Sequence, residues 1–263
     1  MSLAPAGRPL DRVADRPLDV VLLQVRYPWH ERAELQEREC FADRCGALPV
    51  RWRAVNLVAA PDVGLDTVEG ADAVMIGGAG SHTVTERYPF SEPLAELIRA
   101  LVAEGRPLFG SCYGHQAIAL ALGGRVATDP AREEVGTFEI ELTAEGRRDP
   151  LLAGMPGRFA VHLGHHDVVV ELPPGMVELA RSAVCPNQVV RVAGKPVYGT
   201  QFHCEMTREQ MVLRLGMYRA EYLPGSDLES ELERRLGATP DAESLLCRFL
   251  ETFAALEARP VVA

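Results

Sequence analysis

A cysteine flanked by glycines is the residue of this sequence best suited to covalent chemistry. An apolar run over residues 107–109 leads into Gly110-Ser111-Cys112-Tyr113-Gly114, and residues 115–122 continue with a helical pattern. A strand, a tight turn and a helix in this order form a nucleophile elbow, in which small flanking residues let the backbone bend. The N–H groups and the positive dipole at the start of the helix favour a thiolate. We therefore predict that Cys112 is a nucleophile; the alternative is a buried cysteine in a glycine-rich turn.

A cysteine nucleophile needs a base and a further group that orients the base. Residues 197–202 predict a strand that runs into His203-Cys204-Glu205. Side chains two residues apart lie on the same side of a strand, so the Glu205 carboxylate can accept a hydrogen bond from one ring nitrogen of His203. The other nitrogen is then free to face the thiol.

A second glycine-rich segment is a candidate for stabilising the oxyanion that forms when a thiolate attacks a carbonyl. Gly77-Gly78-Ala79-Gly80 follows an apolar run, and it lacks the spacing of a dinucleotide-binding or Walker-type phosphate loop. The backbone N–H groups of Gly78 and of Tyr113 are the two donors that we expect.

Alternating strands and helices must position these segments. The first half predicts strands at residues 19–25, 50–57 and 73–76 and before Cys112, with helices at 31–45, 93–103 and 115–122. This order is typical of an α/β fold with a mostly parallel central sheet flanked by helices. The second half is rich in strands and ends in helices. Its strands are expected at residues 134–143, 159–163, 177–181, 188–192 and 197–202, and its helices at 207–222, 229–236 and 242–256.

The composition restricts the possible partners and locations. The 263 residues carry a formal net charge of −10, which argues against nucleic acid as a partner because phosphate binding needs a basic surface. No apolar run approaches the roughly 20 residues that span a bilayer, so we expect no membrane association. Residues 1–16 lack the apolar core of a signal peptide, and we expect a cytoplasmic protein. The six cysteines show no C-x-x-C pair and are expected to be free thiols without a metal.

We divide the chain into three parts: a loose leader (1–17), a main domain (18–225) and a helical C-terminal extension (226–263). The extension carries an apolar face that either packs on the same domain or docks a synthetase or a second copy of the chain. The residues of this face are Leu232, Leu236, Leu245, Leu246, Phe249 and Leu250.

Taken together, three segments resemble those of the class I, triad-type glutamine amidotransferases, which hydrolyse glutamine to glutamate and ammonia. They are Gly77-Gly78, residues 110–116 and residues 199–205, in the order and spacing of that family, and the resemblance covers about residues 18–222. It implies a flavodoxin-like fold, chemistry without a metal or organic cofactor, and transfer of ammonia to an acceptor on a separate synthetase subunit. It also leaves a homo-oligomer possible.

The resemblance also implies a role for each matching residue. Cys112 would be the nucleophile, His203 the base and then the acid, and Glu205 the orienting carboxylate. Gly78 and Tyr113 would supply the oxyanion N–H groups. The residues expected on the substrate side are Gln116, His165 and His166.

One residue departs from the pattern, because Cys204 stands where the family usually has a proline that would fix the turn. Three alternatives stay open. A γ-glutamyl peptidase would use the same triad on a larger γ-glutamyl amide. A hydrolase of the dienelactone type would take its acid from Asp167, which precedes His203. A binding protein on this scaffold would not turn over substrate at all.

Overall fold

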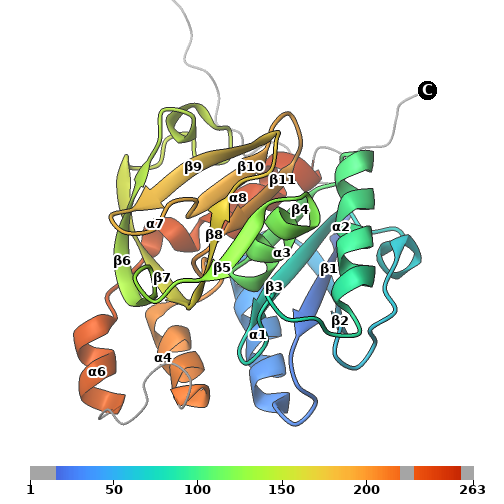
Figure 1. The fold of residues 1–263 in the computed structure, drawn as a ribbon. Coiled ribbons are helices and arrows are strands. Elements are labelled where there is room, and N and C mark those ends of the chain that lie inside the picture. The colour runs from blue at the N-terminus through green and yellow to red at the C-terminus, as the bar shows by residue number, and fades with distance from the viewer. Residues whose placement is uncertain (1–15, 220–227, 256–263) are drawn as a thin grey trace, which may run out of the picture.

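A nine-stranded mixed sheet forms the centre of the structure, a computed structural model that describes residues 16–219 and 228–255 (Figure 1). Its strands are β1 (Leu18–Val25), β2 (Val50–Asn56), β3 (Ala73–Ala79), β4 (Leu108–Ser111), β6 (Glu134–Leu142), β7 (Arg158–His165), β9 (Met176–Ser182), β10 (Val189–Val192) and β11 (Val197–Thr200). They lie in the order β2-β1-β3-β4-β11-β10-β9-β6-β7. Neighbours from β2 to β11 are parallel, and those from β11 to β7 are antiparallel. The α/β prediction is therefore confirmed, with a parallel half and a strand-rich antiparallel half.

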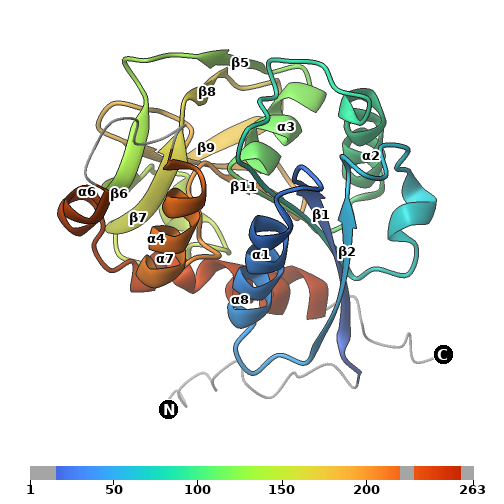
Figure 2. The ribbon, with the colours of Figure 1, turned by 90° about the horizontal axis from the view of Figure 1, so that it is seen from below.

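Helices cover both faces of the sheet (Figure 2). They are α1 (Glu31–Asp43), α2 (Ser91–Glu104), α3 (Tyr113–Ala121), α4 (Arg208–Met217), α6 (Leu228–Arg235), α7 (Pro240–Glu243) and α8 (Leu245–Phe249), and α8 continues as a π-helix over Leu250–Ala254. Strand β1 shows why two layers are needed. Leu18, Val20 and Leu22 pack in the same cluster as α1 and α8, whereas Val21 and Leu23 pack in the cluster that contains α2 and α3. Burial on both faces explains the nearly continuous apolar sequence of this strand.

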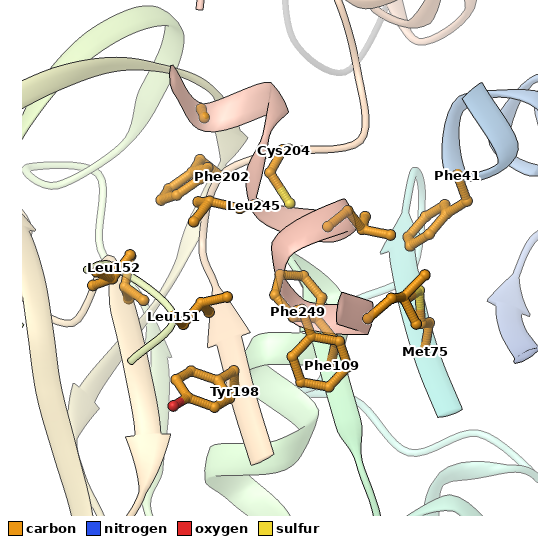
Figure 3. Packing of buried hydrophobic residues seen from close by; sticks show 14 of the residues in the cluster. Phe41, Met75, Phe109, Leu151, Leu152, Tyr198, Phe202, Cys204, Leu245 and Phe249 are labelled. Carbon is orange, nitrogen blue, oxygen red and sulfur yellow. The ribbon is translucent and has the colours of Figure 1, made fainter. Parts of the chain in front are cut away.

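The C-terminal helices contribute to the main hydrophobic core (Figure 3). Phe249 is fully buried, with its ring centroid 5.2 Å from that of Phe109 on β4 and 6.0 Å from that of Tyr198 on β11. All six apolar side chains proposed for the face of the extension are buried within this chain, four of them in the main core and Leu232 and Leu236 in a smaller cluster.

The structure differs from the predicted elements in a few places. The last core strand ends at Thr200 instead of residue 202. The predicted helix over 207–222 ends at Met217, and residues 220–222 lie outside the described residues; its cap at Thr207 is confirmed, because Thr207 accepts a hydrogen bond from the Gln210 N–H. The predicted helix over 242–256 is broken into short helical pieces.

Two strands were missed, β5 (Arg125–Thr128) and β8 (Asp167–Glu171), which form a separate two-stranded sheet. β5 has only four residues, too few to show a clear period. The proposed leader lies almost entirely outside the described residues. Within those residues, every helix is too short or too polar to cross a bilayer.

Candidate active site

The carboxyl ends of three parallel strands meet at the predicted elbow. β4 lies between β3 and β11, with Gly110 paired to Gly199 and Ser111 paired to Thr200. Cys112 follows β4 directly and occupies the N-cap position of α3. Ligands of open α/β sheets bind at this edge, and the register therefore brings the segment after β11 beside the cysteine.

The backbone of Cys112 has the strained geometry of a nucleophile elbow. Its φ is 50° and its ψ is −97°, a region that residues with a side chain rarely adopt. The flanking glycines have no room for a side chain. A Cβ on Gly110 would lie 2.4 Å from the backbone of Gly114, and a Cβ on Gly114 would lie 2.3 Å from the carbonyl oxygen of Ile76. Close backbone packing therefore holds the cysteine in this unfavourable conformation.

The thiol of Cys112 is buried among polar groups. Its Sγ lies 3.8 Å from Gln201 Nε2, which donates to it, and 4.0 Å from the carbonyl oxygen of Gly164. The His203 side chain also interacts with this thiol. Gln201 was not among the predicted site residues, although it lies within the segment that carried the resemblance.

His203 and Glu205 form the predicted pair. His203 Nδ1 lies 2.7 Å from Glu205 Oε1, and the other carboxylate oxygen accepts a hydrogen bond of 2.8 Å from Ser111 Oγ. The segment that holds the pair is a turn, not the predicted strand, but it still places both side chains on one side. The sulfur of Cys204, between them, points into the main core (Figure 3), where burial raises its pKa well above that of an ordinary thiol. Cysteine in place of the usual proline therefore leaves the His–Glu contact intact.

The pKa values of the pair shift in the directions that favour its charged form. Burial alone would lower the pKa of His203, but the negative charge of Glu205 and the contact with Cys112 outweigh it and raise this pKa to about 9. For Glu205, burial would raise the pKa, and the His203 charge and hydrogen bonds outweigh that effect and lower it. His203 is consequently an imidazolium near neutral pH, with Nδ1 fixed on the carboxylate and Nε2 available to the thiol.

The two glycines expected near the oxyanion lie within β3 at an irregularity of the sheet. Leu23 pairs with Ile76 and Val25 pairs with Ala79, so that Gly77 and Gly78 together face a single residue of β1. This is a β-bulge, a feature often found beside active sites. A Cβ on Gly78 would lie 2.9 Å from His203 Cε1, so its backbone passes directly against the imidazole. Tyr113 is the first residue of α3, where a backbone N–H has no partner within the helix.

A buried ion pair that the sequence did not predict supports this bulge. Arg26 Nη2 lies 2.7 Å from Glu37 Oε1, and both side chains are almost fully buried. A Cβ on Gly77 would lie 2.5 Å from the same carboxylate oxygen. Arg26 also donates to Tyr218 Oη at 3.1 Å. Its partners lie far apart in the chain, so no local pattern pointed to them.

A cavity of about 470 Å³ opens from the thiol. It is lined by residues 79–83 and Glu86, and by Thr128 and residues 164–167. Tyr113 and Gln116 also line it, beside Cys112. Its side chains include the carboxylates of Glu86 and Asp167, which suits a ligand that carries an ammonium group.

The three residues expected on the substrate side all line this cavity, but they are already engaged. Gln116 Nε2 donates to the carbonyl oxygen of Asp167 at 2.8 Å and to Gln201 Oε1 at 3.1 Å. His165 uses both ring nitrogens, toward the Asp167 carbonyl oxygen and toward Glu134. His166 is half-exposed and lies 2.8 Å from a carboxylate oxygen of Glu133.

The Asp167 carboxylate is not the partner of His203. Its carboxylate accepts hydrogen bonds from the hydroxyls of Thr83 and Thr128, on two different segments of the cavity wall. The partner of His203 is Glu205 instead. The alternative of a dienelactone-type hydrolase, which needed Asp167 in that place, is therefore wrong.

Comparison with known proteins agrees with this geometry. The family model for glutamine amidotransferase class-I matches residues 49–215. One subunit of a glutamine-hydrolysing GMP synthase from Methanosarcina mazei is 43% identical over 101 residues, which are 38% of this chain and 51% of that protein. The corresponding subunit from Thermococcus kodakarensis is 38% identical over 104 residues, 40% of this chain and 53% of that protein. The chain thus spans about half the length of the curated relatives that it matches.

Solved structures show the same fold at low sequence identity. A glutamine amidotransferase from Thermotoga maritima matches with a TM-score of 0.67 and 20% identity, over 92% of this chain and 97% of that one. A glutamine amidotransferase from Methylobacillus flagellatus matches with a TM-score of 0.66 and 21% identity, over 93% of this chain and 96% of that one. With the family model covering more than half of its length, the chain belongs to the glutamine amidotransferase class-I family.

Proposed function

We propose that this protein hydrolyses the side-chain amide of glutamine through Cys112, His203 and Glu205, and that a separate acceptor subunit consumes the ammonia. The observation that supports this most strongly is the contact of 2.7 Å between His203 and Glu205, on an imidazole that also meets the thiol at the elbow. The base contacts the nucleophile on one side and the orienting carboxylate on the other, which is the arrangement that acyl transfer requires.

The first half of the reaction forms a thioester. In the resting pair His203 Nε2 already holds the proton from Cys112, and the thiolate attacks the side-chain carbonyl carbon of glutamine. The carbonyl oxygen becomes an oxyanion, which accepts hydrogen bonds from the N–H groups of Gly78 and Tyr113. The tetrahedral intermediate collapses, the C–N bond breaks, and the imidazolium gives its proton to the departing nitrogen, so that ammonia leaves.

The second half regenerates the enzyme. His203 takes a proton from water, and the resulting hydroxide attacks the γ-glutamyl thioester carbon. The C–S bond breaks and glutamate leaves, which restores the thiolate of Cys112 and the imidazolium of His203. Glu205 stays ionised throughout and stabilises the imidazolium that forms in both halves.

The glutamine itself would occupy the cavity beside the thiol. Its α-ammonium group would pair with a carboxylate of Glu86 or Asp167, both of which line the cavity together with residues 164–166. We assign Gln116 and His165 to holding this segment, because their polar atoms already bind it or its neighbours. His166 remains a candidate for direct contact.

The relatives suggest where the ammonia goes. Two of them are named as one subunit of a glutamine-hydrolysing GMP synthase. By analogy, we propose that the chain works with a separate synthetase subunit, without a nucleic-acid or membrane partner. No organic cofactor or metal enters the chemistry proposed here.

A γ-glutamyl peptidase is the second candidate, and the size of the cavity favours it. Its volume of about 470 Å³ lies within the range of roughly 300–1,000 Å³ that holds drug-sized ligands. A leaving group larger than ammonia would therefore find room. The same triad and the same thioester serve both reactions.

Glutamate release from free glutamine and from γ-glutamyl dipeptides tests both candidates. We expect turnover by the wild-type chain and by Cys247→Ser, a control at a cysteine remote from the elbow, and none by Cys112→Ala. Preference for dipeptides would favour the peptidase. If neither substrate turns over, labelling of Cys112 by a glutamine-like electrophile indicates a site that waits for its partner. Absence of labelling would contradict the proposal and favour a non-catalytic scaffold.

A further inference from the structure

Three metal-ligating side chains meet behind the wall of the active-site cavity. Glu134 begins β6, His165 ends β7, and Cys185 lies in the loop between β9 and β10. One donor atom from each residue lies within 4.8 Å of the other two, and all three residues are at most 3% exposed. No step of the proposed reaction uses this cluster.

When the His165 imidazole is neutral, one of its ring nitrogens is a hydrogen-bond acceptor that faces another acceptor. Its Nδ1 lies 3.1 Å from the carbonyl oxygen of Asp167, and a carbonyl can only accept, so Nδ1 carries the hydrogen. In a neutral imidazole, Nε2 then presents a lone pair. That lone pair points at a carboxylate oxygen of Glu134 only 3.2 Å away. Two acceptors at this distance need a cation between them, and either a proton or a metal ion supplies it. A backbone carbonyl that fixes one nitrogen while the other faces a metal is the usual environment of a histidine ligand.

Two polar atoms beside His165 also lack partners. Glu134 Oε2 accepts a hydrogen bond of 2.6 Å from Gln188 Nε2, but Glu134 Oε1 is buried with no hydrogen-bond partner among the described residues. Gln188 Oε1 is likewise buried and has no hydrogen-bond partner among the described residues. Buried polar atoms without partners are rare and unfavourable, and their presence on one cluster indicates a missing ligand.

The donor set and its spacing suit zinc. Thiolate, imidazole and carboxylate are its three usual ligand types, at about 2.3, 2.0–2.1 and 2.0–2.2 Å. Tetrahedral coordination at these lengths places the nitrogen and the oxygen roughly 3.3 Å apart, close to the 3.2 Å found between His165 and Glu134. The sulfur of Cys185, now within 4.8 Å of the other two donor atoms, must come closer when the metal binds. Rotation of the Gln188 amide would bring its oxygen to the side of Glu134, and that oxygen or a water would complete the shell.

We propose that Glu134, His165 and Cys185 bind a zinc ion that fixes one wall of the active site. Cys185 gives up its thiol proton to solvent when the metal binds, and the metal replaces the proton that the sulfur held. The ion would join the start of β6, the end of β7 and the β9–β10 loop. The carbonyl oxygen of Gly164, next to His165, lies 4.0 Å from the nucleophilic sulfur, so the ion would act on the shape of the cavity and not on the chemistry.

The test uses metal-free Cys112→Ala protein, which removes the catalytic thiol as a competing ligand. Titration with Co²⁺ should produce a thiolate-to-cobalt band in the near ultraviolet and the strong visible bands of a tetrahedral ion, saturating at one equivalent. Zn²⁺ should abolish these bands. At a free concentration of about 100 Kd, Zn²⁺ should also raise the melting temperature by roughly 5–10 °C.

Two variants in this background locate the site. Cys185→Ser, which is nearly isosteric, should lose the thiolate band while keeping the melting temperature of the metal-free protein. Glu134→Gln should weaken Co²⁺ binding at least about tenfold. Cys247→Ser, the matched control, should bind as before.

The proposal is overturned if no band and no thermal shift appear, or if both persist in Cys185→Ser. Detection of protons on both ring nitrogens of His165 by NMR in the zinc-treated protein would equally overturn it, since it would identify a buried imidazolium–carboxylate pair. Because all measurements use a variant without the nucleophile, none of them depends on turnover of glutamine.

Discussion

Ser111, the residue before the proposed nucleophile, donates a hydrogen bond of 2.8 Å to Glu205, the carboxylate proposed to orient the base. The two are 94 positions apart in the chain, and the parallel pairing of β4 with β11 brings them together. The end of β4 therefore positions the Cys112 side chain and also, through Ser111, the Glu205 oxygen that does not contact His203.

Ser111→Ala should lower kcat about tenfold to a hundredfold, because a hydrogen bond to a charged group contributes about 1.5–3 kcal/mol. The pKa of Glu205 should rise without the donor, so the acid limb of the kcat/KM profile should move to higher pH. Steady-state glutaminase assays across pH test both effects. Ser244→Ala, at a serine whose hydroxyl bonds only to the Asp241 carbonyl oxygen of its own turn, is the control. An unchanged acid limb would mean that Ser111 only fills space.

Glutamine hydrolysis should decline as pH rises through about 9. The pKa of His203 is raised to that value, so the imidazolium that protonates ammonia persists below it and is lost above it. A pKa above the usual 6.5 also means that this group stabilises the fold fully below pH 6.5 and loses that contribution as pH rises through 9. Glu205→Gln removes the main group that raises this pKa, and should move the alkaline limb of kcat/KM to lower pH. If the alkaline limb of kcat/KM lies at the same pH in the wild type and in Glu205→Gln, a group other than His203 causes it.

The parts of the site that local sequence encodes were predictable. The glycines around Cys112 specify the elbow because only they allow such close backbone packing, and a spacing of two residues was enough to pair His203 with Glu205. Contacts that depend on register were not predictable. Gln201 at the thiol and Ser111 at Glu205 each require knowing that β4 and β11 are neighbours, and the buried Arg26–Glu37 pair requires knowing how α1 packs on the end of β1.

The fold shows the same division between local and long-range information. The parallel half follows from apolar runs alternating with helices, and the order of its elements along the chain agrees with the prediction. The strand end at Thr200 was placed two residues too late because Phe202 continues the apolar pattern into the turn. Asp167 appeared to be a possible triad acid by chain order alone, whereas its contacts with Thr83 and Thr128 arise only when the cavity wall is assembled.

Gly78→Ala should reduce kcat by about 10²–10³ with little loss of secondary structure. The new methyl carbon would lie 2.9 Å from His203 Cε1, so either the imidazole or the oxyanion N–H must move. Gly237→Ala is the matched control, because the nearest atom to its added carbon is 3.8 Å away. Kinetics and circular dichroism on the two variants make the comparison. Equal activity in both would show that the bulge of β3 plays no part in catalysis.

Phe249→Ala should destabilise the protein by about 3–5 kcal/mol, the usual range for removing a buried aromatic side chain. The ring is fully buried between Phe109 and Tyr198, on the two central strands that carry the elbow and lead to the histidine. Urea unfolding of this variant and of Leu213→Ala, whose side chain is 47% exposed, would measure the difference. We expect deletion of residues 226–258 to prevent folding for the same reason. If the deleted chain instead folds and hydrolyses glutamine, these residues form a separable extension, and a role in docking a partner regains support.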